Sequence, residues 1–198
     1  MTTHKRALGP LERIFPMPCV LIASGSLENP GVLTAAWINV VASTPPTIVV
    51  GLRETRNTLA QMQKTGCFSV NIPSTSHVAQ VDYLGIKSGS DGTNKLEEAG
   101  LTVSAGEYNG VPLINECLYN LECVVSATNI VGSYHVITAE IVQSYADESI
   151  LIDETGNVVS MEALDPLMYI AGNREYRAIG EKVADAYSIG VLSSERHK

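Results

Sequence analysis

The sequence contains no long hydrophobic run. Its apolar stretches, such as residues 47–52, fall well short of the roughly 18 apolar residues that a membrane-spanning helix needs. Residues 1–10 also lack the apolar core of a secretory signal peptide. We therefore expect a cytoplasmic protein that makes no contact with a membrane.

Cysteine and histidine are scarce and scattered. The chain has four of each, and no two cysteines form a CxxC pair. They are Cys19, Cys67, Cys117, Cys123, His4, His77, His135 and His197. Metal sites need clustered ligands and redox disulfides need paired thiols. We therefore expect no metal site, and we interpret the thiols as small buried side chains in a reducing compartment.

Basic residues are outnumbered by acidic ones. Thirteen Lys and Arg residues stand against twenty-one Asp and Glu residues, which gives a net charge of −8 at pH 7. Because a negative protein repels the phosphate backbone, nucleic-acid binding is not expected. An anionic cofactor would need a local cluster of basic side chains.

Several catalytic signatures are also missing. The sequence has no GxGxxG or GxxxxGK[ST] nucleotide motif, no HExxH zinc motif and no GxSxG serine-hydrolase motif. No pattern pairs a cysteine with a histidine as nucleophile and base. Hydrolysis is therefore not indicated.

The residues that are present suffice for one domain. The chain has 198 residues, of which 45% are hydrophobic. This is enough to bury one core and too little for two of ordinary size. We expect a single domain over residues 1–198.

Short segments rich in Val, Ile and Thr, each bounded by turn residues, are the dominant pattern. They predict strands at residues 19–24, 32–41, 47–52, 68–72, 119–126 and 136–142. Helices are expected at about residues 57–64, 76–84 and 93–99, and a glycine closely follows each. The strands outnumber the helices and do not alternate with them, which favours a mainly β protein, an antiparallel barrel with peripheral helices.

The most informative stretch covers residues 33–58. Small side chains at residues 34–36 would let a flat ligand approach the backbone. Arg53, Arg56 and Thr58 cluster where a helix is expected to begin, and unpaired N–H groups there favour an anion. The pattern indicates a phosphate site. The alternative is a capped helix with solvated arginines.

Motifs along nearly the whole chain point to one family. They are PMPCVLIAS, LTAAW, the break at Ser43, Pro45 and Pro46, LRETRNT, FSVNIPS, DYLGIKSG followed by Lys95, LECVV and MYIAGNREYRAIG. In this order and spacing, the sequence resembles the flavin reductase-like, FMN-binding split-barrel family, and within it the flavoredoxin-type proteins. The resemblance implies a Greek-key antiparallel split β-barrel that binds FMN non-covalently.

The resemblance implies three groups of residues around the flavin. The polar edge of the isoalloxazine would meet backbone groups of Thr34, Ala35, Ala36 and Trp37, while the Trp37 ring itself is interpreted as core or subunit-interface packing. The ribityl phosphate would be held by Arg53, Arg56, Asn57 and Thr58. The phosphate end would be closed by Ser88, Gly89 and Lys95. Asn94 departs from the family pattern, which has an acidic residue before the lysine.

The resemblance also implies an activity and partners. A C-terminal segment shared across a homodimer would supply contacts to the pocket or to a nicotinamide through Tyr169, Arg174 and Tyr176. Electrons would pass from NAD(P)H, or from another donor, through FMN to a small-molecule or protein acceptor. Because the flavin carries this chemistry, no catalytic side chain is expected.

Two other readings stay open. A flavoredoxin-type electron carrier with permanently bound FMN would exchange electrons with protein partners and show little turnover with NAD(P)H. A barrel that has lost its flavin would serve as an interaction or ligand-binding module. The presence of Arg56, Thr58 and the small residues at 34–36 disfavours the second of these readings.

Overall fold

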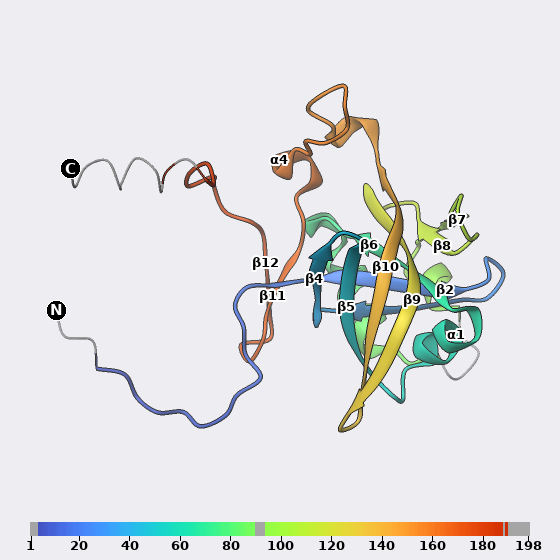
Figure 1. The fold of residues 1–198 in the computed structure, drawn as a ribbon, viewed down its shortest axis with the longest axis horizontal. Coiled ribbons are helices and arrows are strands. Elements are labelled where there is room, and N and C mark those ends of the chain that lie inside the picture. Colours follow the sequence, from blue (N-terminus) through green and yellow to red (C-terminus); the bar gives the residue numbers. More distant parts are fainter. Residues whose placement is uncertain (1–3, 90–93, 188, 190–198) are drawn as a thin grey trace.

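A seven-stranded antiparallel sheet forms the centre of the computed structural model, which describes residues 4–89, 94–187 and 189 (Figure 1). Along the sheet the strand order is β3-β2-β6-β9-β10-β5-β4. The strands are β2 (Val20–Gly25), β3 (Pro30–Ala35), β4 (Ile38–Ser43), β5 (Pro46–Arg53), β6 (Cys67–Ile72), β9 (Tyr119–Val131) and β10 (Tyr134–Ala146). The sequence therefore predicted the fold class correctly, and each main strand lies near an expected one, with corrections at residues 32–41 and in the β9–β10 hairpin.

The split in the barrel lies between β3 and β4. These two strands form opposite edges of the sheet, yet only Ala36 and Trp37 separate them in sequence. The single strand expected at residues 32–41 is wrong. The structure has two strands there, β3 and β4, and they lie at opposite edges of the sheet. Just beyond the break, the Gly51 N–H donates to the Trp37 carbonyl at 2.8 Å and ties the crossing to β5. The antiparallel split barrel is confirmed.

The β9–β10 hairpin is longer than the pattern predicted. Each strand has 13 residues, and side chains near the turn are exposed, including Ile130 and Val131. Backbone pairing thus continues beyond the part of the hairpin that covers the core. Alternation of polar and apolar residues marks only the buried part, which is why the sequence underestimated the length.

Three helices lie around the barrel near the expected positions. They are α1 (Asn57–Thr65), α2 (Val78–Ile86) and α3 (Lys95–Glu98), and a 3-10 turn, η1 (Thr75–His77), precedes α2. Gly66 ends α1 in the left-handed conformation, with φ of 70°. The Asn94 side chain caps α3 by accepting from the Glu97 N–H at 3.4 Å, so the departure from the family pattern still provides a cap. Thr93 of the expected third helix lies outside the described residues.

Several short elements were not predicted. They are β1 (Met17–Pro18), β7 (Val103–Ala105), β8 (Pro112–Ile114), β11 (Met168–Ile170), β12 (Glu175–Arg177), η2 (Glu148–Ile150) and α4 (Met161–Leu164). β1, β11 and β12 form a separate small sheet, and β7 pairs with β8. Elements of two to four residues are too short to show a period in the sequence.

The core has two parts, one on each face of β2. Ile22 packs with Phe68 and Val50 inside the barrel. The preceding residue, Leu21, packs with Val81 and other residues on the opposite face. Successive strand residues point to opposite faces, so β2 is buried on both sides. This second part of the core fixes α2 against the outside of the barrel.

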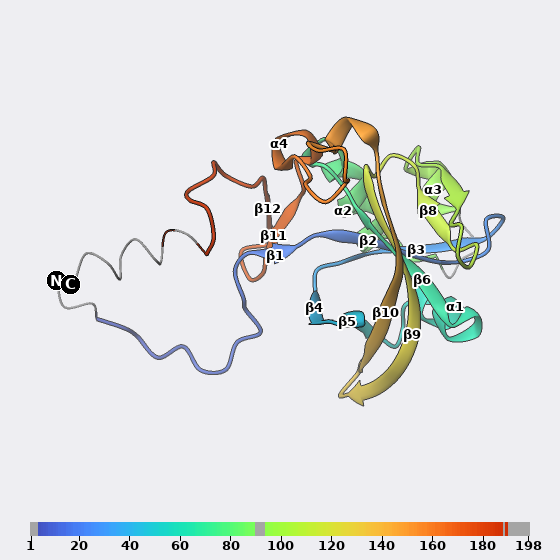
Figure 2. The same ribbon diagram turned by 45° about the horizontal axis from the view of Figure 1, so that its top comes forward.

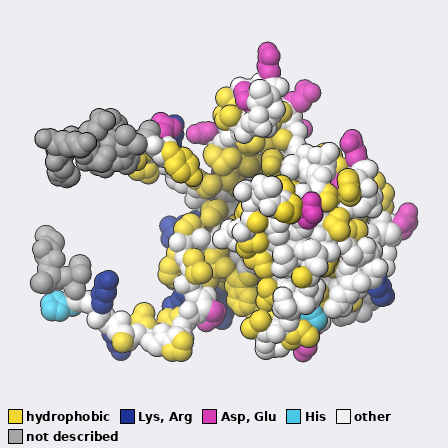
Figure 3. All heavy atoms as spheres, in the orientation of Figure 1, with side chains coloured by type: hydrophobic (Ala, Val, Ile, Leu, Met, Phe, Trp, Pro, Cys, Tyr) yellow, Lys and Arg dark blue, Asp and Glu magenta, His cyan; other side chains and the backbone are white. Residues whose placement is uncertain are grey.

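Both chain ends run away from the barrel on the same side (Figures 1 and 2). Large apolar side chains along them are exposed, among them Ile14 at 76%, Val183 at 98% and Tyr187 at 100%. In the space-filling view, hydrophobic atoms also gather on the barrel around the hollow between the two ends (Figure 3). No helix in the described part of the chain is both long and apolar enough to cross a membrane.

A buried carboxylate holds the loop between β7 and β8. Glu122 of β9 is fully buried and accepts the backbone N–H groups of Tyr108 and Asn109, both at 3.1 Å, together with the Tyr145 hydroxyl. Partial burial and the bond to Glu122 raise the pKa of Tyr145 to about 12. A Cβ on Gly106 would lie 2.3 Å from the Glu122 carboxyl carbon, so only glycine fits there.

We predict that Gly106→Ala lowers the free energy of unfolding by about 1–3 kcal/mol, because the methyl group must displace a carboxylate that three donors hold in place. Urea denaturation measures the change. Gly180→Ala is the matched control, since a Cβ there meets no atom within 4 Å. Equal stability of the two variants would contradict this account of Glu122.

Candidate functional site

A pocket of about 510 Å³ opens between the β2–β3 hairpin, the start of α1 and the loop that follows α2. Seven residues singled out from the sequence line it: Arg53, Arg56, Asn57, Thr58, Ser88, Gly89 and Lys95. They come from two segments that lie thirty positions apart, and the fold brings them together. Their contacts with a ligand stay a prediction.

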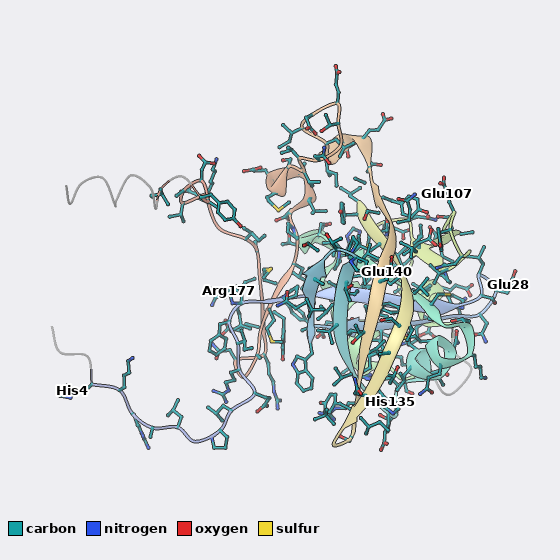
Figure 4. All side chains as sticks on the ribbon, in the orientation of Figure 1. His4, Glu28, Glu107, His135, Glu140 and Arg177 are labelled. Carbon is teal, nitrogen blue, oxygen red and sulfur yellow. The ribbon has the colours of Figure 1, made fainter. Side chains whose placement is uncertain are left out.

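Positive charge is concentrated in this pocket, which we call the phosphate pocket. Arg53, Arg56, Lys87 and Lys95 line it, while Glu28 is the acidic residue among its lining. Figure 4 shows Glu28 at the outer end of the β2–β3 hairpin. The chain as a whole carries a net charge of −8, so this excess of basic groups is local. It supplies the basic cluster that an anionic ligand requires.

Arg56 connects two walls of the phosphate pocket. It stands at the N-cap of α1, and its Nη1 donates to the Gly85 carbonyl near the end of α2 at 3.1 Å. Thr58, in the first turn of α1, is buried. The first N–H groups of a helix have no partner within the helix, so the start of α1 adds donors beside the guanidinium.

Lys95 shapes the opposite wall. It is only 8% exposed, and its Nζ donates to the carbonyls of Leu84 at 3.3 Å and Lys87 at 3.1 Å. A Cβ on Gly89 would lie 3.4 Å from Cε of Lys95 and 3.8 Å from Nδ2 of Asn57. The chain therefore passes closely over Lys95, and the lysine both charges the pocket and holds the loop after α2.

A second pocket of about 160 Å³ adjoins the first along residues 34–37. It is lined by Thr34, Ala35, Ala36, Trp37, Gly51 and Tyr134, and it shares Leu33, Arg53 and Arg56 with the phosphate pocket. We call it the ring pocket. β3, which forms one side of it, pairs in the described sheet only with β2. Its other edge offers backbone N–H and C=O groups to a flat polar ligand.

Tyr134 is a site residue that sequence reasoning missed. It lies opposite Arg53 in the β5–β10 pairing, and its hydroxyl accepts from Arg53 Nε at 2.7 Å. The Trp37 ring centroid lies 4.6 Å from that of Tyr134, and Trp37 is 37% exposed. Within the chain Trp37 is therefore not a core residue, and Tyr134 holds both the indole and the guanidinium at the rim of the ring pocket.

A third pocket of about 240 Å³ lies on the α2 side of residues 34–36, and we call it the tyrosine pocket. It shares Thr34 and Ala36 with the ring pocket and is also lined by Cys19, Asp82, Gly85, Ile86, Tyr169 and Tyr176. The two tyrosine rings lie 5.8 Å apart. The structure thus brings Tyr169 and Tyr176 next to residues 34–36, and their contact with a ligand stays a prediction.

The Tyr176 hydroxyl donates to Asp82 Oδ1 at 2.9 Å, and burial together with this bond raises the pKa of the phenol. Burial and the nearby Asp82 carboxylate raise the pKa of Cys19 to about 12, so the thiol is an inert part of the pocket wall at neutral pH. The field of Asp82 thus reaches across the tyrosine pocket.

Arg174 is placed differently from the other predicted residues. It lies in the turn between β11 and β12 with φ of 59°, and its N–H donates to the Ile170 carbonyl at 3.0 Å. It is exposed and lines none of the three pockets. Its contact with a nicotinamide stays a prediction.

Within the described ranges, no group of three or more potential metal ligands is present.

Comparison with known proteins gives one consistent family. The family model described as "Flavin reductase like domain" matches residues 11–180. An uncharacterized protein of Archaeoglobus fulgidus is 33% identical over 131 residues, which are 66% of this chain and 73% of that protein.

Solved structures agree with this match. Flavoredoxin of Desulfovibrio vulgaris (Miyazaki F) has a TM-score of 0.86 and 31% identity, and the similarity covers 94% of this chain and 100% of that one. Flavoredoxin from Methanosarcina acetivorans has a TM-score of 0.85 and 27% identity, with coverage of 98% and 100%.

The thiols provide a test of the geometry around the pockets. Cys19, Cys117 and Cys123 are buried and burial raises the pKa of each to about 12, whereas Cys67 is partly exposed. We predict that iodoacetamide at pH 8 labels Cys67 first in the native protein, because the other thiols are neither ionised nor accessible. Peptide mass spectrometry identifies the labelled residue. Labelling of Cys19 ahead of Cys67 would contradict the burial of Cys19 in the wall of the tyrosine pocket.

Proposed function

The chain belongs to the flavin reductase-like family, and from this premise we propose that it binds FMN and passes electrons from NAD(P)H through the flavin to an acceptor. The observation that carries the proposal is the continuity of the ring pocket with the phosphate pocket. A flat polar ring and a single phosphate, joined by a flexible chain, match these two spaces. FMN has these parts.

The residues present fit the cofactor. The open edge of β3 between Thr34 and Ala35 would accept the hydrogen-bonding edge of the isoalloxazine, and small side chains there let the ring approach. Arg56 and the start of α1 would bind the phosphate by charge-assisted hydrogen bonds. The close passage of Gly89 over Lys95 would close the phosphate end.

When bound, the flavin supplies hydride and one-electron transfer. The chain supplies position. Tyr134 and Arg53 fix one rim of the ring pocket by their 2.7 Å hydrogen bond. The Thr34 hydroxyl donates to the Val81 carbonyl at 2.5 Å and fixes the other side against α2. A site built in this way orients a donor and an acceptor without a catalytic acid or base.

A second function has support from the relatives. Two solved structures of high similarity are named flavoredoxins, which favours a carrier that exchanges electrons with proteins. The tyrosine pocket favours the enzyme, because a carrier has no need of a small-molecule space beside the ring. We therefore place NAD(P)H-dependent electron transfer first.

We predict that the purified protein is yellow, or becomes so with added FMN, and that it releases FMN on denaturation. Mixing the flavin-loaded protein with NADH or NADPH in a stopped-flow instrument should bleach the flavin absorbance. Bleaching by neither nucleotide, with reduction by a protein donor, would favour the carrier. Protein that fails to bind added FMN would overturn the proposal.

We predict that Arg56→Ala weakens binding of FMN about 10- to 150-fold and that of riboflavin much less, because the charge-assisted contact exists only with phosphate. Fluorescence titration of each ligand measures both affinities. Arg177→Ala is the control, since Arg177 pairs with Glu175 at 2.7 Å and lies on the side of the molecule opposite Glu28 (Figure 4). Equal weakening of FMN and riboflavin would assign Arg56 a purely structural role.

We also propose that the protein is a homodimer. The chain ends and the hollow beside the barrel expose apolar surface to water, and a subunit contact would bury that surface. The chain ends project from the barrel, so a second copy seated in the hollow would bury them. An isologous contact of this kind closes after two copies.

Sedimentation equilibrium tests this directly, and we expect a dimer at micromolar concentration. Val183→Glu should shift the equilibrium toward monomer, because a charge replaces an apolar side chain that is 98% exposed in the single chain. Leu27→Glu is the control, because this partly exposed apolar residue lies next to Glu28 at the outer end of the β2–β3 hairpin, on the side of the molecule opposite the chain ends (Figure 4). A stable monomer of the unaltered protein with FMN bound would refute the dimer.

A further inference from the structure

Tyr134 holds two neighbouring side chains at the rim of the ring pocket. Its hydroxyl accepts from Arg53 Nε at 2.7 Å, and the guanidinium carbon of Arg53 lies over its ring, 5.4 Å from the centroid. The centroid of the Trp37 ring lies 4.6 Å from that of Tyr134, with the two planes tilted by 39°. The guanidinium is therefore held both by a hydrogen bond and by the face of an aromatic ring.

The strand register explains this grouping. Arg53 of β5 and Tyr134 of β10 are directly opposite in the antiparallel pairing, so their side chains lie on the same face of the sheet. Gly51 shares that face, and a Cβ there would lie 3.7 Å from the Cβ of Trp37. Leu52, between Gly51 and Arg53, is buried in the core. The side chains of Trp37, Tyr134 and Arg53 thus lie on the face that points away from the barrel core.

The charge of Arg53 is not neutralised within the chain. No carboxylate of the described ranges forms a salt bridge with Arg53. Its Nε is committed to Tyr134, which leaves the two terminal nitrogens to meet another acceptor. Arg53 also lines both the ring pocket and the phosphate pocket. The guanidinium therefore brings a positive charge to the boundary between the two pockets.

Charge at this boundary matters for a flavin, because reduction changes the charge of the flavin ring. The oxidised ring is neutral, and when it takes up two electrons and one proton it gains one negative charge. A fixed cation beside the ring therefore stabilises the reduced form relative to the oxidised form. A cation that meets only the phosphate stabilises the two forms almost equally, because the phosphate charge does not change.

We infer that Tyr134 is a positioning residue that holds the Arg53 guanidinium beside the flavin ring, where its charge favours the reduced flavin. Phosphate binding then falls mainly to Arg56 and the start of α1. The inference rests on the proposed function and adds to it a side chain that sets the reduction potential of the bound cofactor.

Redox titration of the FMN-loaded protein with dithionite, against a dye of known potential, measures the midpoint potential. Arg53→Gln removes the charge, and we expect reduced FMN to lose about tenfold more affinity than oxidised FMN, which lowers the potential by about 30 mV. Tyr134→Phe keeps the ring beside Trp37 and removes only the hydroxyl, and we expect a loss of about threefold, or about 14 mV. Tyr108→Phe is the control, since Tyr108 is 66% exposed and lines none of the three pockets.

A double variant separates positioning from a general structural effect. If Tyr134 acts through Arg53, Tyr134→Phe should leave the potential unchanged when it is added to Arg53→Gln. Fluorescence titration with FMN and riboflavin gives a second readout. Tyr134→Phe should leave the ratio of the two affinities unchanged, because the contacts to the phosphate remain.

The outcomes separate this inference from the proposed function. If FMN binds but Tyr134→Phe keeps the potential of the unaltered protein, or lowers it equally with and without Arg53, the inference is wrong and the proposed function stands. If Tyr134→Phe weakens FMN and not riboflavin, Arg53 serves the phosphate and the inference is again wrong. If FMN itself does not bind, the proposed function fails and the inference fails with it.

Discussion

The hydrogen bond from Arg56 to the Gly85 carbonyl joins the two halves of the candidate site. It links the beginning of α1, which follows β5, to the end of α2, which packs against β3. This hydrogen bond connects the α1 wall of the phosphate pocket to the α2 wall. The same group carries the charge that the pocket presents to an anion, so one side chain serves both structure and binding. Substitutions at Arg56 therefore need a ligand-dependent readout to separate these roles.

The distribution of charge explains how an acidic chain can hold an anionic cofactor. Basic groups converge in the phosphate pocket, while the adjoining tyrosine pocket has a carboxylate. The strand between them carries small side chains at Thr34, Ala35 and Ala36, so a flat molecule can approach its backbone. This arrangement suits a protein that positions reactants around a redox ring and leaves the chemistry to that ring.

The sequence predicted most of the barrel and the basic cluster at the start of α1, because each leaves a local pattern. Alternating residues mark the buried strands, and Arg53, Arg56 and Thr58 lie within six positions of one another. The sequence did not predict Tyr134 as a site residue, because only the β5–β10 register brings it next to Arg53. The sequence did not predict the burial of Glu122 for another reason. A polar residue in an alternating strand predicts an exposed face, but the loop at Tyr108 and Asn109 covers that face. Contacts between residues far apart in the sequence leave no pattern in the residues next to them along the chain.

The central claim is that one continuous site holds a flavin ring over residues 34–37 and its phosphate at the start of α1. A crystal structure of the protein with FMN tests it most directly. We predict density for the phosphate within hydrogen-bonding distance of Arg56 and Thr58, and for the isoalloxazine along the open edge of β3. Flavin bound elsewhere on the molecule, or bound here with its phosphate away from Arg56, would contradict the account.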